Sequence, residues 1–119
     1  MTNLTRKFRS SLLSTVGRFS RQDVVVLGDM VADEFIYGEI ARVSREAPVL
    51  ILKQRDRRIV PGGGANAANN LADLGARVTP MGLVGDDPSG DALLQYFKDK
   101  GVATGGLLRV PGYTTPTKS

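Results

Sequence analysis

The stretch VPGGGANAANNLADLG, residues 60–75, places three consecutive glycines before an alanine- and leucine-rich run that ends in another glycine. The run predicts a helix over about residues 64–74, with Gly75 at the left-handed position that commonly follows a helix. Glycines have no Cβ, so their backbone N–H groups can approach a bound molecule closely. The stretch predicts either a ligand site at a helix start, where phosphate is the common ligand, or a tight loop without a ligand.

Strand-like segments lie on both sides of this helix. DVVVLGD, residues 23–29, is a β-branched run that predicts a buried parallel strand. Residues 76–85 predict another strand, in which Pro80 favours a bend or a sheet edge. Segments that mix apolar and charged residues predict a small exposed sheet at 34–40, 47–53 and 55–60, the last either continuing the second or forming its own strand. Further strands are expected at 106–110 and at the start of TTPTKS, residues 114–119.

A second helix is predicted after residue 86. Asp87 can cap its N-terminus, Pro88 suits its first position, and Gly101 can end it. Its apolar face is supplied by Leu93, Leu94 and Phe97.

The order of elements is strand, small β excursion, helix, strand, helix, strand. Helices that alternate with strands predict an α/β fold with a mainly parallel sheet flanked by helices. Few strands have accumulated when the sequence reaches its last residues, and one sheet edge would lie open. We therefore expect an incomplete domain, the N-terminal part of a larger one.

Composition excludes several kinds of site. The chain has 119 residues with no cysteine and no histidine. Disulfides and thiolate metal sites are therefore excluded, and the usual general base at neutral pH is missing. No apolar run approaches the roughly 20 residues that a membrane-spanning helix needs. Acid–base chemistry would have to come from carboxylates or from groups outside this chain.

Residues 1–22 form a separate basic segment, with five Lys or Arg and no acid, whereas residues 23–119 carry a net charge of −1. Apolar residues recur every four positions, which predicts an amphipathic helix: Leu4, Phe8, Leu12 and Val16. We expect this helix to pack on the body. An organelle transit segment and attachment to an anionic membrane surface are the alternatives. No aromatic platform accompanies the charge, so we expect no nucleic-acid partner.

Two carboxylates and an amide are expected near the glycine run. Asp29 and Asp33 follow the first strand, and ligands of open α/β sheets bind outside the carboxyl ends of strands. Carboxylates accept hydrogen bonds from the hydroxyls of a diol, and the Asn66 amide can donate and accept. With the bare backbone of Gly62 and Gly63, these groups predict a polyol site and disfavour an anion. The structural alternative is that both acids are ordinary turn or surface residues.

Two motifs in this order carry a family resemblance. GGGANAANNLADLG (62–75) and VGDDPSGDALLQYFKDKGV (84–102) resemble the N-terminal signature of the ribokinase-like (PfkB) carbohydrate kinases, and the resemblance covers residues 23–119. Within that family, residues 28–53 are most similar to the branch that phosphorylates D-glycero-β-D-manno-heptose 7-phosphate at the anomeric oxygen. That reaction is a step toward ADP-heptose for the lipopolysaccharide core. Arg45 stands where that branch usually has a proline.

The resemblance implies roles for individual residues. It implies that Asp33, or else Asp29, hydrogen-bonds sugar hydroxyls, and that Gly62, Gly63 and Asn66 also contact the sugar. The Gly-Gly pair would be the hinge under a lid.

The lid would be the small β excursion, about residues 34–60, which in this family closes over the sugar and often mediates dimerisation. Lys118 falls where the family's Thr-Lys strand begins, near the substrate.

The same resemblance implies ATP and Mg²⁺ for the complete enzyme. The family's phosphate-cradling motif and catalytic Asp lie further along the chain, so no catalytic residue or metal ligand is assigned here. We expect a cytoplasmic homodimer, joined through the lid, that binds a sugar or sugar phosphate, and we expect the 119-residue chain alone not to turn over. Alternatives are a kinase of another sugar or nucleoside, a non-catalytic sugar- or nucleoside-binding module, and an inert truncated product.

Overall fold

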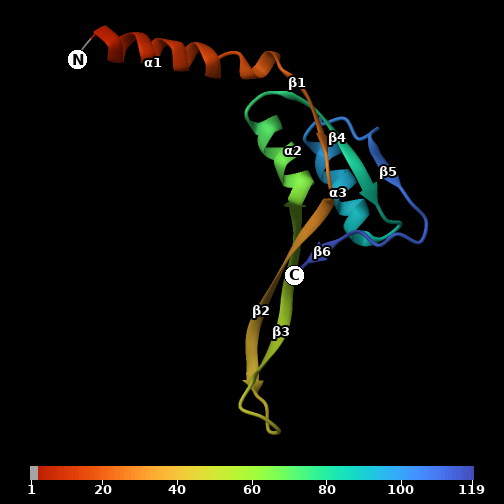
Figure 1. The fold of residues 1–119 in the computed structure, drawn as a ribbon. Coiled ribbons are helices and arrows are strands. Elements are labelled where there is room, and N and C mark those ends of the chain that lie inside the picture. The colour runs from red at the N-terminus through yellow and green to blue at the C-terminus, as the bar shows by residue number, and fades with distance from the viewer. Residues whose placement is uncertain (1–2) are drawn as a thin grey trace.

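The computed structural model describes residues 3–119, with side chains from Thr5 onward. Figure 1 shows an α/β body from which a helix and a hairpin project. The helices are α1 (Asn3–Val16), α2 (Gly63–Asp73) and α3 (Pro88–Asp99), with a 3₁₀ turn at Phe19–Arg21. The strands are β1 (Asp23–Leu27), β2 (Met30–Val43), β3 (Leu50–Gly62), β4 (Arg77–Val84), β5 (Leu107–Arg109) and β6 (Thr117–Lys118). The predicted alternation of strands and helices is confirmed.

One parallel sheet has the strand order β1-β4-β5, and α2 and α3 cover only one of its faces. The core on that face includes the fully buried Leu93 and Phe97. On the opposite face, the side chains of Val25 and Leu27 are 63% and 81% exposed. The first strand is parallel as predicted, but the expectation that it is buried was wrong, because side chains alternate across a strand and no helix among residues 3–119 covers the second face.

Pro80 lies in the central strand and is buried, so the edge position favoured by the sequence was wrong. Gly82, two residues later, donates its N–H to the Gly106 carbonyl at 3.1 Å. Alternate residues of a strand face the same neighbour, so the nitrogen of Pro80 also faces the β5 side. Pairing with β5 begins only at Gly82, so no ladder hydrogen bond is lost at Pro80.

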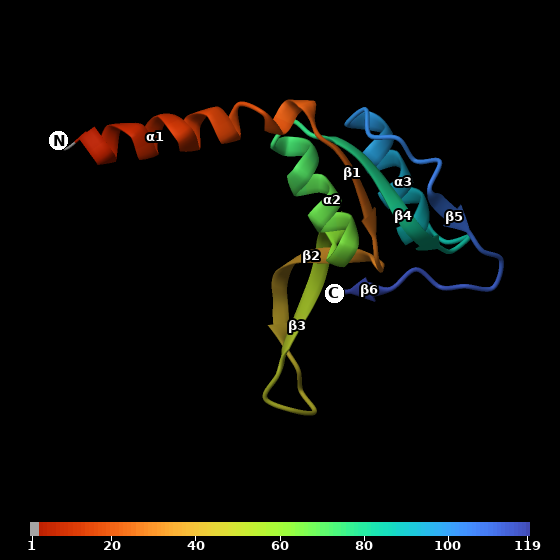
Figure 2. The same cartoon turned by 45° about the horizontal axis from the view of Figure 1, so that its top comes forward.

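The second sheet has the order β3-β2-β6. β2 and β3 form a long antiparallel hairpin that extends away from the body (Figures 1 and 2), with register shifts after Tyr37 and Ile40. The strands extend beyond the predicted 34–40 and 47–53, and the alternative in which 55–60 continues the second strand is confirmed, because β3 runs without a break from Leu50. The segment TTPTKS does enter a strand, which pairs in parallel with β2 in this second sheet.

α1 is a helix, as expected of the basic segment, but it does not pack on the body. Phe8, Leu13 and Val16 are 66%, 64% and 57% exposed, and Figure 2 shows α1 projecting away from the sheets. The packing expectation was therefore wrong. The helix ends at Val16 and the chain turns before β1, so the apolar side of α1 is not placed over α2. Among residues 5–22, Phe19 in the 3₁₀ turn is the one side chain that is partly buried.

The body helices are bounded by the residues that the sequence predicts. Gly75 follows α2 with a φ of 91°, and Gly101 follows α3 with a φ of 73°. These angles are costly for residues with a Cβ. Asp87 caps α3 by accepting the Gly90 N–H at 2.7 Å, and Pro88 is the first helical residue.

Candidate functional site

The base of the hairpin brings Asp33 against the glycine run. Asp33 lies in β2 opposite Val60 of β3, and Val31 lies opposite Gly62. A Cβ on residue 62 would lie 2.7 Å from the carboxylate carbon of Asp33, closer than real Cβ contacts come. Glycine at position 62 therefore leaves the space in which the Asp33 carboxylate sits.

Asp29 supports the glycine run through its backbone. Its carbonyl accepts the Gly64 N–H at 2.8 Å, while its side chain is exposed. Gly63 has a φ of 53°, and a Cβ there would lie 2.8 Å from a methyl group of Val31. Close packing of the chain at the β1–β2 junction thus explains Gly63 and Gly64. The N–H of Gly64 is used inside the protein and is not available to a ligand.

Asn66 lies in the first turns of α2, and its side chain is exposed. Its neighbour Asn69 has a different role, because its Oδ1 accepts the Tyr96 hydroxyl at 3.0 Å and also an N–H of Lys100. Asn69 therefore joins α2 to α3. Asn66 is the amide near the glycine run that is left open to a ligand.

Lys118 is brought beside Asp33 by the parallel pairing of β6 with β2. The two are register partners, and Ala32 donates its N–H to the Pro116 carbonyl at 2.8 Å. Lys118 is exposed, and within residues 3–119 it forms no ion pair with Asp33. A carboxylate and an ammonium group therefore lie on neighbouring strands at the base of the hairpin.

Glu34 is a residue of this region that the sequence analysis missed. It accepts hydrogen bonds from the Ser119 hydroxyl and the Arg57 guanidinium. These two hydrogen bonds lower the pKa of Glu34 below its ordinary value, and the one from Ser119 has the larger effect. The alternation of side chains along β2 puts Glu34 and Asp33 on opposite faces, so Glu34 links β2 to β3 and to Ser119.

A buried polar network fixes the segment that leads into β6. Thr115 is 1% exposed, and its hydroxyl accepts the Gly85 N–H at 2.9 Å. Its own N–H donates to Asp87 Oδ2 at 2.7 Å, while the other carboxylate oxygen caps α3 at Gly90. Burial raises the pKa of Asp87, but these N–H donors outweigh it, and the net pKa is lowered. The sequence identified Asp87 only as a helix cap; its second role depends on a residue 28 positions away.

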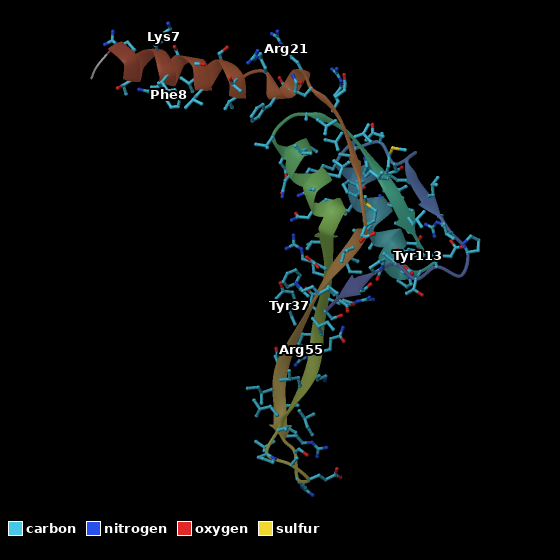
Figure 3. The ribbon with its side chains drawn as sticks, viewed as in Figure 1. Lys7, Phe8, Arg21, Tyr37, Arg55 and Tyr113 are labelled. Carbon is cyan, nitrogen blue, oxygen red and sulfur yellow. The ribbon has the colours of Figure 1, made fainter. Side chains whose placement is uncertain are left out.

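The open face of the parallel sheet contains a hollow of about 390 Å³ next to Asp29. Its lining includes Gly28, Gly82 and Gly106, together with Tyr113 from the loop before β6, which is labelled in Figure 3. The hollow lies at the carboxyl edge of β1 and β4, where open α/β sheets bind ligands. Asp29 is thus a charged group in the lining of a mainly apolar hollow.

Comparison with known proteins agrees with this architecture. Residues 21–119 match the profile of the pfkB family of carbohydrate kinases. The bifunctional protein HldE of Magnetococcus marinus is 37% identical over 85% of this chain, and that of Gluconobacter oxydans is 43% identical over 86%. A crystal structure of fructokinase with bound ATP from Xylella fastidiosa is similar over 80% of this chain and 26% of its own, with 27% identity and a TM-score of 0.57. The chain spans 21% of each of the two HldE relatives. The chain belongs to the pfkB family of carbohydrate kinases.

Proposed function

We propose that this chain is the sugar-binding, lid-bearing part of an ATP-dependent carbohydrate kinase. The observation that carries the proposal is the contact of the Asp33 carboxylate with Gly62, at the base of a projecting hairpin. A carboxylate accepts hydrogen bonds from two hydroxyls of a sugar, and Asn66 supplies a donor and an acceptor nearby. Asp29 and the backbone of Gly62 and Gly63 complete the proposed site.

The hairpin is proposed as the lid. Its strands leave the body beside Asp33 and Gly62, so rotation at Gly62 and Gly63 would move residues 34–60 over a sugar bound there. Lys118, on the neighbouring strand, adds a positive charge that suits a phosphorylated sugar. The exposed apolar side chains of the lid also suit a dimer contact.

Heptose 7-phosphate is the substrate we propose, with the anomeric oxygen as the phosphoryl acceptor. The proposal rests on the resemblance of residues 28–53 to the heptose kinase branch and on the identity to the HldE proteins. A kinase of another sugar or nucleoside is the second candidate, favoured by the similarity to a fructokinase. A non-catalytic sugar-binding fragment is the third.

Phosphoryl transfer needs an oriented acceptor, a nucleotide with its metal ion, and a base for the acceptor hydroxyl. ATP with Mg²⁺ supplies the phosphoryl group in such reactions. The residues described in this chain provide the first requirement by binding and orienting the sugar. Among the side chains described, from Thr5 to Ser119, no group of three His, Cys, Asp or Glu is placed to hold a metal ion.

The proposed site is tested by calorimetric titration of heptose 7-phosphate, ribose and fructose into the chain and its variants. Asp33→Asn should weaken binding by about 1.5–3 kcal/mol, the value of a hydrogen bond to a charged group, and Asn66→Ala by about 0.5–1.5 kcal/mol, the value of a neutral hydrogen bond. The matched control is Asp99→Asn, an exposed carboxylate on α3 that lies outside the proposed site. Unchanged affinity in both site variants would refute the assignment. If ribose or fructose bound more tightly than heptose 7-phosphate, the proposed substrate would be refuted, whereas the assignment of the site would stand.

A second test asks whether the gene continues. A Gly-Ala-Gly-Asp-like motif in the reading frame beyond Ser119 would support the kinase, because the family's catalytic Asp lies in such a motif. A stop codon directly after Ser119 would favour a non-catalytic binding module or an inert truncated product.

A further inference from the structure

α1 carries an apolar stripe that is open to solvent. Phe8, Leu12 and Val16, spaced four residues apart, share one side of the helix. Their side chains are 66%, 51% and 57% exposed. Figure 3 shows Lys7 above and Phe8 below the ribbon of α1, so the charged and the apolar side chain leave the helix in different directions. The structure removes the simplest explanation of this stripe, which is packing on the body of the same chain.

The same segment, residues 1–22, carries positive charge and contains no acidic residue. Arg6, Lys7 and Arg9 lie on α1, and Arg18 and Arg21 follow it, with no acid among residues 1–22. In the described part of the chain, the ion pairs all join residues between 23 and 109, and none involves these five. Two α1 helices would repel each other, and the body has a net charge of only −1, so a second copy is a poor partner.

We propose that α1 is a docking helix for an anionic phospholipid surface. A short helix with an apolar stripe and Lys or Arg on its other sides lies in the plane of a membrane interface, with the stripe among the acyl chains. The 14 residues of α1 give a helix of about 21 Å, too short to cross a bilayer. None of the helices described is long and apolar enough to do so. The docking would hold the kinase body at the surface and does not depend on the sugar site.

Charge complementarity selects this partner. Each Lys or Arg near an anionic bilayer adds about 1 kcal/mol of attraction. Neutral vesicles would be bound by the apolar stripe alone, which offers only a few side chains. The proposal therefore requires both the stripe and the charges, and the two can be removed separately because α1 is exposed.

The first experiment is co-sedimentation of the 119-residue chain with vesicles of phosphatidylcholine mixed with phosphatidylglycerol, and with pure phosphatidylcholine. We expect binding to the mixed vesicles only, and its loss between about 0.1 M and about 1 M salt. Arg6→Gln, Lys7→Gln and Arg9→Gln together should weaken it on the order of a hundredfold. Phe8→Ser with Leu12→Ser should weaken it by at least about tenfold.

The matched control removes three exposed positive charges outside α1: Arg42→Gln, Arg45→Gln and Lys98→Gln. This variant should keep nearly all vesicle binding. Equal weakening by this control would show a general charge effect and overturn the proposal. Circular dichroism and thermal unfolding verify that each variant keeps its fold, which we expect because every altered side chain is exposed.

The second experiment uses the fact that the chain has no tryptophan. Phe8→Trp places one fluorophore on the stripe, and Ser10→Trp places one about 200° around the helix. Mixed vesicles should shift the emission of Trp at position 8 to shorter wavelength and leave that at position 10 nearly unchanged. No shift at position 8, or equal shifts at both, would overturn the proposal. Self-association that is abolished by Phe8→Ser, or binding to RNA in preference to vesicles, would overturn it in favour of those partners.

Discussion

The Asp33 carboxylate fills the space that a Cβ on residue 62 would need, with 2.7 Å between that Cβ position and the carboxylate carbon. Gly62→Ala should therefore push Asp33 out of its place. We expect sugar affinity to fall roughly tenfold, about 1.4 kcal/mol, and stability to fall by about 1 kcal/mol from overpacking. Gly105→Ala is the control, since a Cβ there meets no atom within 4 Å. Equal sugar affinity of Gly62→Ala and Gly105→Ala would contradict this role of Gly62.

Asp87 should contribute to stability in a pH-dependent way. Asp87→Ala removes the α3 cap and the acceptor for the Thr115 N–H, which should cost about 1–3 kcal/mol at neutral pH. The folded pKa of Asp87 is lowered, so this stability is present above the unfolded pKa of about 3.9 and is lost as pH falls through the folded value. In urea unfolding, the difference in free energy of unfolding between the wild-type chain and Asp87→Ala should be smaller at about pH 3 than at about pH 6.

The control for Asp87 is Asp91→Ala in the same helix. Asp91 pairs with Arg109 at 2.5 Å, but its side chain is 67% exposed. An exposed pair of this kind contributes at most about 1 kcal/mol. A larger loss from Asp91→Ala than from Asp87→Ala would show that the buried network is not the stabilising feature.

The hairpin should mediate self-association. Ile40 and Leu52 are register partners on β2 and β3, and their side chains are 65% and 61% exposed. Ile40→Lys with Leu52→Lys should convert a dimer to a monomer in sedimentation velocity, because charged side chains disfavour burial in an apolar contact. Lys98→Gln on α3 should leave the dimer intact. A wild-type chain that remains monomeric at high concentration would rule out this role of the hairpin.

The core of the body should depend on Phe97. This side chain is fully buried and meets the Tyr96 ring edge-on, with 6.0 Å between the centroids. Phe97→Ala should lower the free energy of unfolding by about 3–5 kcal/mol. Leu108→Ala, at a side chain that is 60% exposed, should change it by about 0.5 kcal/mol or less. An equal decrease in the melting midpoints of the two variants would contradict this prediction.

The 119-residue chain should not turn over by itself. It supplies candidates for sugar binding, whereas phosphoryl transfer also requires a held nucleotide and a base. A coupled assay for ADP release, with Mg-ATP and sugars including heptose 7-phosphate, should give no rate above a sugar-free blank. An active fructokinase verifies the assay. Sugar-dependent turnover that is lost in Asp33→Asn would defeat this prediction.

Local chemistry in the sequence was sufficient for the elements and their ends. Gly75 and Gly101 end helices because the left-handed backbone conformation there favours glycine. Asp87 and Pro88 begin a helix because the Asp87 carboxylate accepts a free N–H of the first turn and Pro88 has no N–H that needs a partner. The alternation of these elements was enough to predict the α/β fold, and the glycine-rich and helix-start motifs were enough to predict the family. The sequence predicted that Asp33 and the glycine run would lie near each other, but their contact comes from the antiparallel pairing of β2 with β3 rather than from the ends of parallel strands.

Long-range contacts decided what the sequence could not. Pro80 sits in a central strand because pairing on its nitrogen side begins only at Gly82, and that register is set by β5. Thr115 and Asp87 meet through the return of the chain to β6, which no local pattern records. α1 is amphipathic by sequence, yet only the tertiary structure, in which α1 projects from the body, decides that its stripe is left exposed. Periodicity along a chain specifies which face of an element is apolar, but the partner of that face depends on where the rest of the chain lies in space.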